Sequence, residues 1–136
     1  MSDASFGECM ESNAAKRITP DKGRALSLQE TAKARLSLVQ GVDERNCNFV
    51  FEDYYTSTLE ILHARALEIG YGVSNHVCLG YFLRDVLKKE EFYPLFDDVR
   101  KKRNDLTYYG ARMDLETAKG AIEKCKRLMR GLKGGM

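Results

Sequence analysis

The chain has 136 residues, of which 43% are hydrophobic and 31% charged, and this fits a single domain with a buried core. No stretch approaches the roughly 20 consecutive apolar residues that a membrane-spanning helix needs. The first 20 residues contain no apolar segment of the kind found in secretory signals. We therefore expect a cytoplasmic protein that does not interact with membranes.

The charges are distributed unevenly along the chain. From Asp97 to Met136 there are 11 Lys and Arg residues and 6 Asp and Glu residues, a net charge of +5. The other 96 residues carry a net charge of −3. A basic C-terminal third favours a polyanionic partner, but a solvated helix face rich in Lys and Arg gives the same pattern. Both interpretations stay open at this point.

Four cysteines occur without a CxxC motif and without a histidine at metal-ligand spacing: Cys9, Cys47, Cys78 and Cys125. We expect buried free thiols that pack as small hydrophobic side chains. The motifs of P-loop, dinucleotide-binding and Ser/His/Asp proteins are also missing from the sequence. The sequence therefore predicts no metal site and no bound cofactor.

Residues 1–21 show no sustained hydrophobic period and are predicted to form a disordered N-terminal tail. A helical bundle is predicted over residues 22–132. Its first helix is expected to start at a capping box at residues 27–30 and to close at Gly41. The apolar stripe of this helix comprises Leu28, Ala32, Leu36 and Val39.

Three further helices are predicted in the middle of the chain. The second spans about residues 45–69 and ends at Gly70, because glycine readily adopts the left-handed conformation that follows a helix. Ser74 is expected to cap the third helix. The fourth runs over residues 94–109, with a proline in its first turn, and Gly110 is its C-terminal stop.

The fifth helix has the clearest hydrophobic period in the chain. Asp114 is predicted to cap it, and its stripe is made of Leu115, Ala118, Ile122, Cys125, Met129 and Leu132. Residues 133–136 are expected to fray. No segment shows the alternation of a strand over a useful length, so the fold class is all-α, an antiparallel bundle of four to five helices.

One residue contradicts the pattern of the fourth helix. The apolar stripe comprises Phe92, Phe96, Val99 and Leu106, and the position that completes it is Arg103. A half-buried arginine is costly unless it is paired, with Asp98 or the last carbonyls of a neighbouring helix as candidates, or faces an anion. Either the side chain reaches the surface, or Arg103 and Asn104 line a groove and contact a phosphate or a partner carboxylate.

The segment 103–110 at the end of the fourth helix resembles the HEPN (higher eukaryote and prokaryote nucleotide-binding) superfamily, and in particular the short HEPN proteins encoded beside minimal nucleotidyltransferases. The resemblance covers about residues 47–132. It rests on the sequence Arg103-Asn104-Asp105-Leu106-Thr107-Tyr108-Tyr109-Gly110 and is supported by Tyr54-Tyr55, Ser74-Asn75-His76 and Phe96-Asp97.

The resemblance implies a helical bundle that forms a two-fold homodimer, with the motif helices of the two subunits facing each other across a cleft. It also implies a minimal nucleotidyltransferase as protein partner and RNA or a nucleotide as ligand. Many members of the family are metal-independent ribonucleases, in which the 2′-hydroxyl of RNA attacks the adjacent phosphate. In that chemistry an arginine stabilises the charge on the phosphate and a histidine moves protons.

Arg103 matches the family arginine and Asn104 its polar neighbour, but Tyr108 stands where the histidine is expected. An imidazole titrates near about 6.5 and a phenol near about 10, so a tyrosine is a poor replacement in proton transfer. The other histidines, His63 and His76, fall on the second and third predicted helices. A surface position for His63 and a capping or packing role for His76 are the simpler interpretations.

Tyr108 and Tyr109 have competing interpretations of their own. Their rings can stack on a base beside Arg103, or they can pack at a helix or subunit interface. Some relatives carry a tyrosine that the partner enzyme nucleotidylates, but Gly110 occupies the matching position here. Modification of Tyr108 or Tyr109 is therefore the weaker hypothesis.

Three functions remain compatible with the sequence. The first is a HEPN-like subunit that binds a nucleotide, RNA or a nucleotidyltransferase without full ribonuclease chemistry, as part of a toxin–antitoxin-like module. The second is an active metal-independent ribonuclease toxin in which Arg103, Asn104 and Tyr108 are the candidate catalytic residues. The third is a structural helical dimer, since a fold alone does not determine function.

Overall fold

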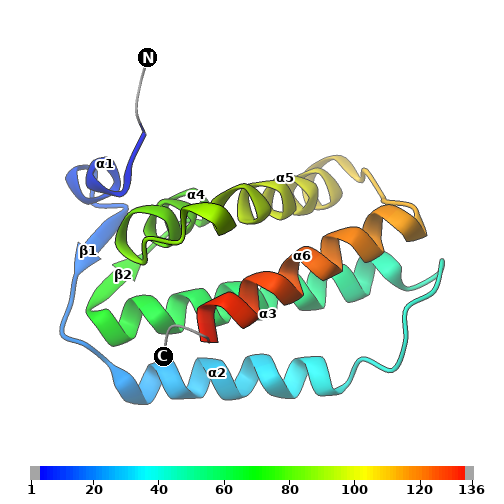
Figure 1. The fold of residues 1–136 in the computed structure, drawn as a ribbon, viewed down its shortest axis with the longest axis horizontal. Helices are drawn as coiled ribbons and strands as arrows, with labels where there is room; N and C mark the ends of the chain where they lie inside the picture. Colours follow the sequence, from blue (N-terminus) through cyan, green and yellow to red (C-terminus); the bar gives the residue numbers. More distant parts are fainter. Residues whose placement is uncertain (1–3, 134–136) are drawn as a thin grey trace.

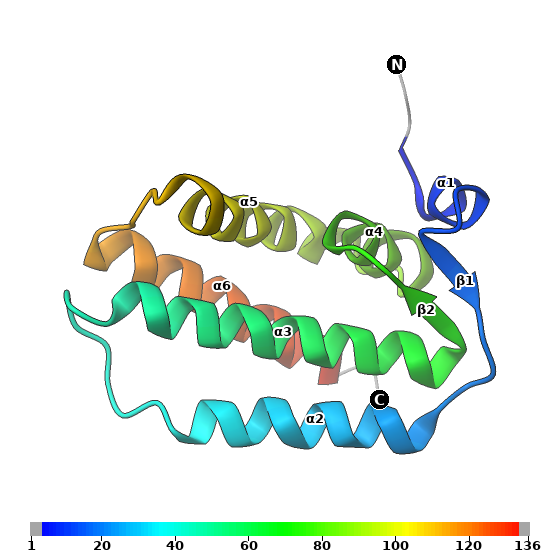
Figure 2. The ribbon, with the colours of Figure 1, turned by 180° about the vertical axis from the view of Figure 1, so that it is seen from behind.

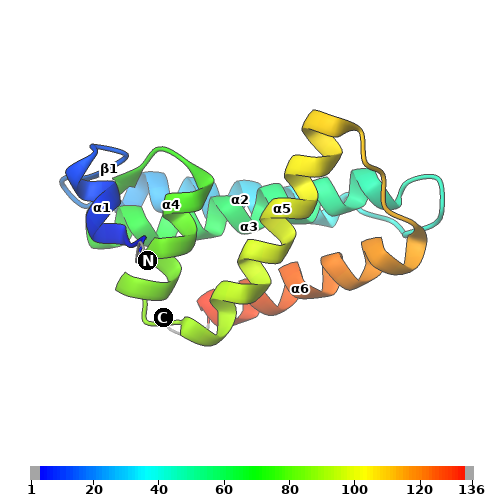
Figure 3. The ribbon, with the colours of Figure 1, turned by 90° about the horizontal axis from the view of Figure 1, so that it is seen from above.

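The computed structural model describes residues 4–133 and is built around one long central helix, α3 (Cys47–Ile69). Helix α2 (Lys22–Ser37) packs along one side of α3, and α6 (Leu115–Lys133) packs along another. Helix α5 (Tyr93–Tyr109) lies against α6 and crosses above α3, as Figure 3 shows. The described residues are mostly helical, which confirms the all-α fold class (Figure 1).

The remaining elements gather at one end of the bundle (Figure 2). Helix α1 (Phe6–Glu11) is followed by strand β1 (Ala15–Arg17), which pairs antiparallel with β2 (Tyr71–Val73) in a two-stranded sheet that the sequence did not predict. Helix α4 (His76–Tyr81) continues into a π-helical turn (Phe82–Val86), and a 3₁₀ turn (Glu90–Phe92) leads into α5.

The predicted disorder of residues 1–21 is wrong for residues 4–21, and residues 1–3 lie outside the described part of the chain. The ring of Phe6 packs edge-on against Tyr71 and Phe82, and its backbone N–H donates to Asp85 Oδ2 at 2.9 Å. These are contacts with residues far along the chain. Tertiary contacts hold this segment in place, so its sequence has no need of a hydrophobic period.

A disulfide bond joins Cys9 of α1 to Cys78 of α4, which corrects the prediction of four free thiols. Cys47 and Cys125 are free and buried, as predicted, and burial raises the pKa of the Cys125 thiol to about 12. Disulfides persist mainly in oxidising compartments. The cytoplasmic location stays a prediction, and this bond counts against it.

The helix boundaries follow local sequence signals, with three corrections. Helix α2 ends at Ser37 with Leu38 as its C-cap, so the predicted stop at Gly41 is wrong. Asp21 caps α2 by accepting from the N–H of Arg24, so the predicted capping box at residues 27–30 lies inside the helix. Asn75 rather than Ser74 caps α4, because its Oδ1 accepts from the N–H of Cys78 at 2.8 Å. The hydroxyl of Ser74 instead donates to the carbonyl of Ala14.

The core confirms most of the apolar stripes predicted for α5 and α6, whereas Ala32 is the one buried member of the stripe predicted for α2. Phe96 and Val99 of α5 are buried, and so are five members of the α6 stripe: Ala118, Ile122, Cys125, Met129 and Leu132. Asp114 caps α6 through the N–H of Thr117, as predicted. Lys133 belongs to this helix, and residues 134–136 lie outside the described residues.

Between residues 4 and 133, no helix is both long enough and apolar enough to cross a bilayer.

Gly70 ends α3 with a φ of +107°, and a Cβ atom at this position would lie 2.9 Å from the carbonyl oxygen of Ile18. We expect Gly70→Ala to lower the free energy of unfolding by about 2–3 kcal/mol, because it adds left-handed strain to a backbone clash. Gly110 also has positive φ, at +63°, but open space around it. Gly110→Ala should therefore cost only about 1 kcal/mol. Urea unfolding of both variants checks this difference, and equal losses would contradict it.

Candidate functional site

Arg103 lies where the buried face of α5 meets the surface of the bundle. Val99 and Phe96, one and two turns earlier on the same face, are completely buried. Arg103 itself is half-buried, and its guanidinium lies over the ring of Tyr55 on α3, 6.0 Å from the ring centroid. The arginine thus completes the apolar stripe against an aromatic face, which a guanidinium tolerates better than an aliphatic contact.

A hollow of about 350 Å³ opens beside Arg103, between the start of α4 and the C-terminal half of α5. Two arginines, a histidine and two amide side chains contribute to its wall, and no Asp or Glu does. The lining residues are Ser74, Asn75, His76, Val77, Arg100, Arg103, Asn104 and Tyr108. A wall that holds cations and neutral polar groups without carboxylates favours an anionic ligand.

His76 enters this hollow from the first position of α4. Its Nδ1 lies 3.1 Å from the hydroxyl of the buried Tyr55, and which of the two groups donates depends on which ring nitrogen carries the proton. The two rings also meet edge-on. The hydrogen bond fixes the orientation of the imidazole and leaves Nε2 as the ring nitrogen not engaged by Tyr55.

The electrostatics of the hollow favour a neutral imidazole near pH 7. Burial lowers the pKa of His76, and the positive charges of Arg103 and Arg100 lower it further. Burial raises the pKa of Tyr55 well above its ordinary value, although the same two arginines oppose this shift. Tyr55 therefore stays a neutral phenol and serves to position the imidazole.

The two arginines of the hollow differ in their partners. Arg100 Nη2 pairs with Asp97 at 2.8 Å, whereas no described carboxylate lies within 4.0 Å of the Arg103 guanidinium. Asp98, the candidate that the sequence suggested for Arg103, instead binds Lys102 and Lys124, each at 2.7 Å. Arg103 is thus the cation whose hydrogen-bonding fork is available to a ligand.

The predicted site residues only partly come together. Asn104 and Tyr108 line the hollow with Arg103, but Tyr109 is not among the lining residues and is 80% exposed. Tyr108 is also 70% exposed, so neither ring packs at a helix interface within this chain. His63 is half-buried on α3 outside the hollow, and burial lowers its pKa.

The contact with Tyr55 confirms the packing role predicted for His76, and the structure also places His76 in the wall of the hollow. Arg103 and His76 lie on different helices, and folding brings them to one hollow. The only hint in the sequence is the segment 74–76, which contributed to the HEPN resemblance. Elsewhere in residues 4–133, no three side chains of His, Cys, Asp or Glu are grouped so that they could hold a metal ion.

The chain was compared with family models, curated proteins and solved structures, and none of them matches.

Proposed function

We propose that this chain is a HEPN-like helical protein that binds the phosphate of RNA or of a nucleotide in the hollow between α4 and α5. One observation carries the proposal. The guanidinium of Arg103, which pairs with no described carboxylate, lines the same hollow as Arg100 and His76, and no carboxylate contributes to the wall of this hollow. A guanidinium binds two phosphate oxygens at once, and this match of geometry and charge favours a phosphate over a simple anion.

The other lining residues suit the rest of a nucleotide. Asn104 offers an amide donor and acceptor for ribose hydroxyls or base edges, and Asn75, whose Oδ1 caps α4, offers its Nδ2 as a donor. The exposed ring of Tyr108 offers a stacking surface. A volume of about 350 Å³ is within the range of small-ligand sites. The basic C-terminal third of the chain adds a general attraction for RNA.

The proposal includes the assembly that the HEPN resemblance implies, a homodimer that associates with a minimal nucleotidyltransferase. The exposed rings of Tyr108 and Tyr109 at the end of α5 suit a contact surface of this kind. Analytical ultracentrifugation should give a dimer at micromolar concentration. A monomer under these conditions would refute the proposed homodimer but would not bear on the proposed phosphate binding.

A direct test is the fluorescence anisotropy of a labelled single-stranded RNA oligonucleotide titrated with the protein. We expect saturable binding that weakens as salt rises, because each phosphate contact releases counterions. An excess of unlabelled RNA should compete, and so should a nucleoside monophosphate at higher concentration. Absence of binding at low salt would refute the proposed function.

A second candidate function, metal-independent RNA cleavage, is favoured specifically by His76. The 2′-oxygen would attack phosphorus and displace the 5′-oxygen, which gives a 2′,3′-cyclic phosphate and a 5′-hydroxyl. A neutral His76 would take the 2′-hydroxyl proton, water would protonate the departing 5′-oxygen, and Arg103 would stabilise the charge on the phosphoryl oxygens. RNA cleavage in EDTA that is lost in both Arg103→Ala and His76→Ala would establish this function. Binding without cleavage would leave the first proposal standing alone.

RNA affinity should depend on pH through His76. Burial and the neighbouring arginines lower the folded-state pKa of His76, so the imidazole is neutral at pH 7 and gains its proton at a lower pH than an ordinary histidine. Protonation adds a positive charge beside the bound phosphate, so we expect affinity to rise about three- to tenfold from pH 7.5 to pH 5. His76→Asn should abolish most of this increase, and an unchanged pH profile would exclude His76 from the binding site.

A further inference from the structure

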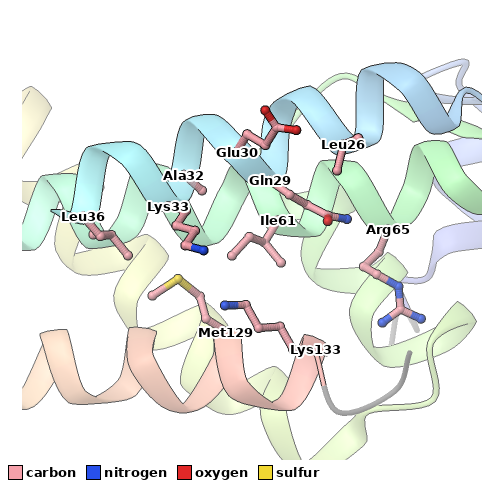
Figure 4. Close-up of a pocket in the computed structure, with 10 residues that line it drawn as sticks. All are labelled: Leu26, Gln29, Glu30, Ala32, Lys33, Leu36, Ile61, Arg65, Met129 and Lys133. Atoms are coloured by element: carbon pink, nitrogen blue, oxygen red, sulfur yellow. The ribbon is translucent and has the colours of Figure 1, made fainter.

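A second cavity, of about 320 Å³, lies on another part of the molecule (Figure 4). Helices α2 and α6 both pack on α3, and they form the two walls of a groove with α3 as its floor. None of its lining residues belongs to the hollow around Arg103. Whatever binds here does not share contacts with the proposed phosphate site.

The groove has an apolar interior. Its apolar lining consists of Leu26, Ala32 and Leu36 from α2, Ile61 from α3 and Met129 from α6. Leu26 is 56% exposed, and a ligand that covered it would remove apolar surface from water. The lining extends along α2 from Leu26 to Leu36, a helical distance of about 15 Å, so the groove is elongated.

Two lysines place positive charge inside this apolar groove. Figure 4 shows Lys33 reaching from α2 and Lys133 from α6, with their ammonium groups directed toward each other across the cavity. No carboxylate of the described residues lies within 4.0 Å of either group. The two ammonium groups repel each other. An anion bound between them would be attracted to both, and these two attractions would offset the repulsion.

The other charged residues of the lining do not neutralise this pair. Glu30 is the only acidic one, and its carboxylate points away from the two lysines in Figure 4. Arg65 is already engaged, because its Nη1 donates to the carbonyl of Leu132 at 2.6 Å and its Nε lies 3.6 Å from Glu68. Lys33 and Lys133 are therefore the cations that the groove offers to a ligand.

From these observations we propose that the groove binds a single-chain fatty acid. The carboxylate lies between the ammonium groups of Lys33 and Lys133, and the alkyl chain covers Ile61, Met129 and the apolar residues of α2. The elongated shape fits an unbranched chain, the paired lysines fit a carboxylate, and the volume is that of a small-molecule site.

Isothermal titration calorimetry with hexanoate, octanoate and decanoate, each below its micellar concentration, tests the proposal. We expect one site per chain, with affinity rising about fourfold for each added methylene as the alkyl chain is buried. Acetate and octylammonium, which lack the chain and the negative charge respectively, should not bind measurably. Failure of decanoate to bind, or equal binding of octylammonium, would overturn the proposal.

A matched pair of double variants locates the site. Lys33→Ala/Lys133→Ala removes both groove lysines and should weaken decanoate binding about tenfold or more. Lys22→Ala/Lys119→Ala removes the same charge from exposed positions on the same two helices and should leave binding unchanged. Equal losses in the two variants would overturn the proposal. So would a dimer in ultracentrifugation that only the Lys33/Lys133 variant dissociates, since a second copy would then occupy the groove.

Discussion

Replacing Arg103 with alanine is expected to weaken RNA binding about tenfold or more while leaving the fold intact. The substitution removes a bidentate, charge-assisted contact to phosphate, and hydrogen bonds of this type contribute about 1.5–3 kcal/mol. The loss of stability should stay below about 1 kcal/mol, because the contact of Arg103 with the Tyr55 ring is long, at 6.0 Å, and no described carboxylate pairs with it.

Two further variants make this result specific. Arg130 is an exposed arginine on α6, so Arg130→Ala removes the same charge at a distance from the hollow and should change RNA affinity much less. Arg103→Lys keeps the positive charge but loses the bidentate geometry of the guanidinium, so it should retain only part of the RNA affinity of the wild type. Equal losses in Arg103→Ala and Arg130→Ala would show a diffuse electrostatic attraction. A stability loss above about 3 kcal/mol in Arg103→Ala would identify Arg103 as a structural residue.

Breaking the disulfide between Cys9 and Cys78 is expected to have the largest effect on stability. The bond links residues 69 positions apart and ties α1 to α4, so its removal frees a long loop in the unfolded state. We expect Cys9→Ser or Cys78→Ser to lower the free energy of unfolding by about 2–4 kcal/mol, measured by urea denaturation.

A reductant supplies the control for this prediction. Dithiothreitol should destabilise the wild type to about the level of Cys9→Ser and should have no further effect on that variant. Both single variants should be equally unstable, because loss of either sulfur removes the same bond. If the reductant leaves the urea midpoint of the wild type unchanged, the bond either does not form in solution or does not stabilise the fold.

The long helices could be predicted because their signals are local. The α6 stripe repeats with helical spacing over five turns, and five of its six members are buried in the structure. Gly70 and Gly110 adopt positive φ where α3 and α5 end, and this requirement of a single residue is visible in the sequence. Such features need no information about the rest of the chain.

The end of the bundle around α1 and the small sheet could not be predicted in the same way. Strands β1 and β2 have three residues each, too short for an alternating pattern, and they pair across more than fifty residues. Cys9 and Cys78 are brought together by the same arrangement. These elements depend on contacts that exist only after the chain has folded, so the local hydrophobic pattern does not predict them.

In the candidate site, too, one residue could be predicted from local sequence and another depends on tertiary packing. Arg103 was found because it interrupts an apolar stripe on one helix, which is a local feature. His76 was assigned to capping or packing because its approach to Arg103 depends on how α4 lies against α5. Its hydrogen bond to Tyr55 joins α3 to α4 and is likewise a product of packing.

The most direct test of the proposed phosphate site is a ¹H–¹⁵N correlation spectrum of the labelled protein, recorded while a short RNA oligonucleotide is added. Binding in the hollow predicts that the largest shifts occur at residues 74–77 and 100–108, which surround it. The same titration of Arg103→Ala should give much smaller shifts at these positions. Shifts confined to the groove between α2 and α6, or spread evenly over the basic surface of the C-terminal third, would contradict the assignment of RNA binding to the hollow around Arg103 and His76.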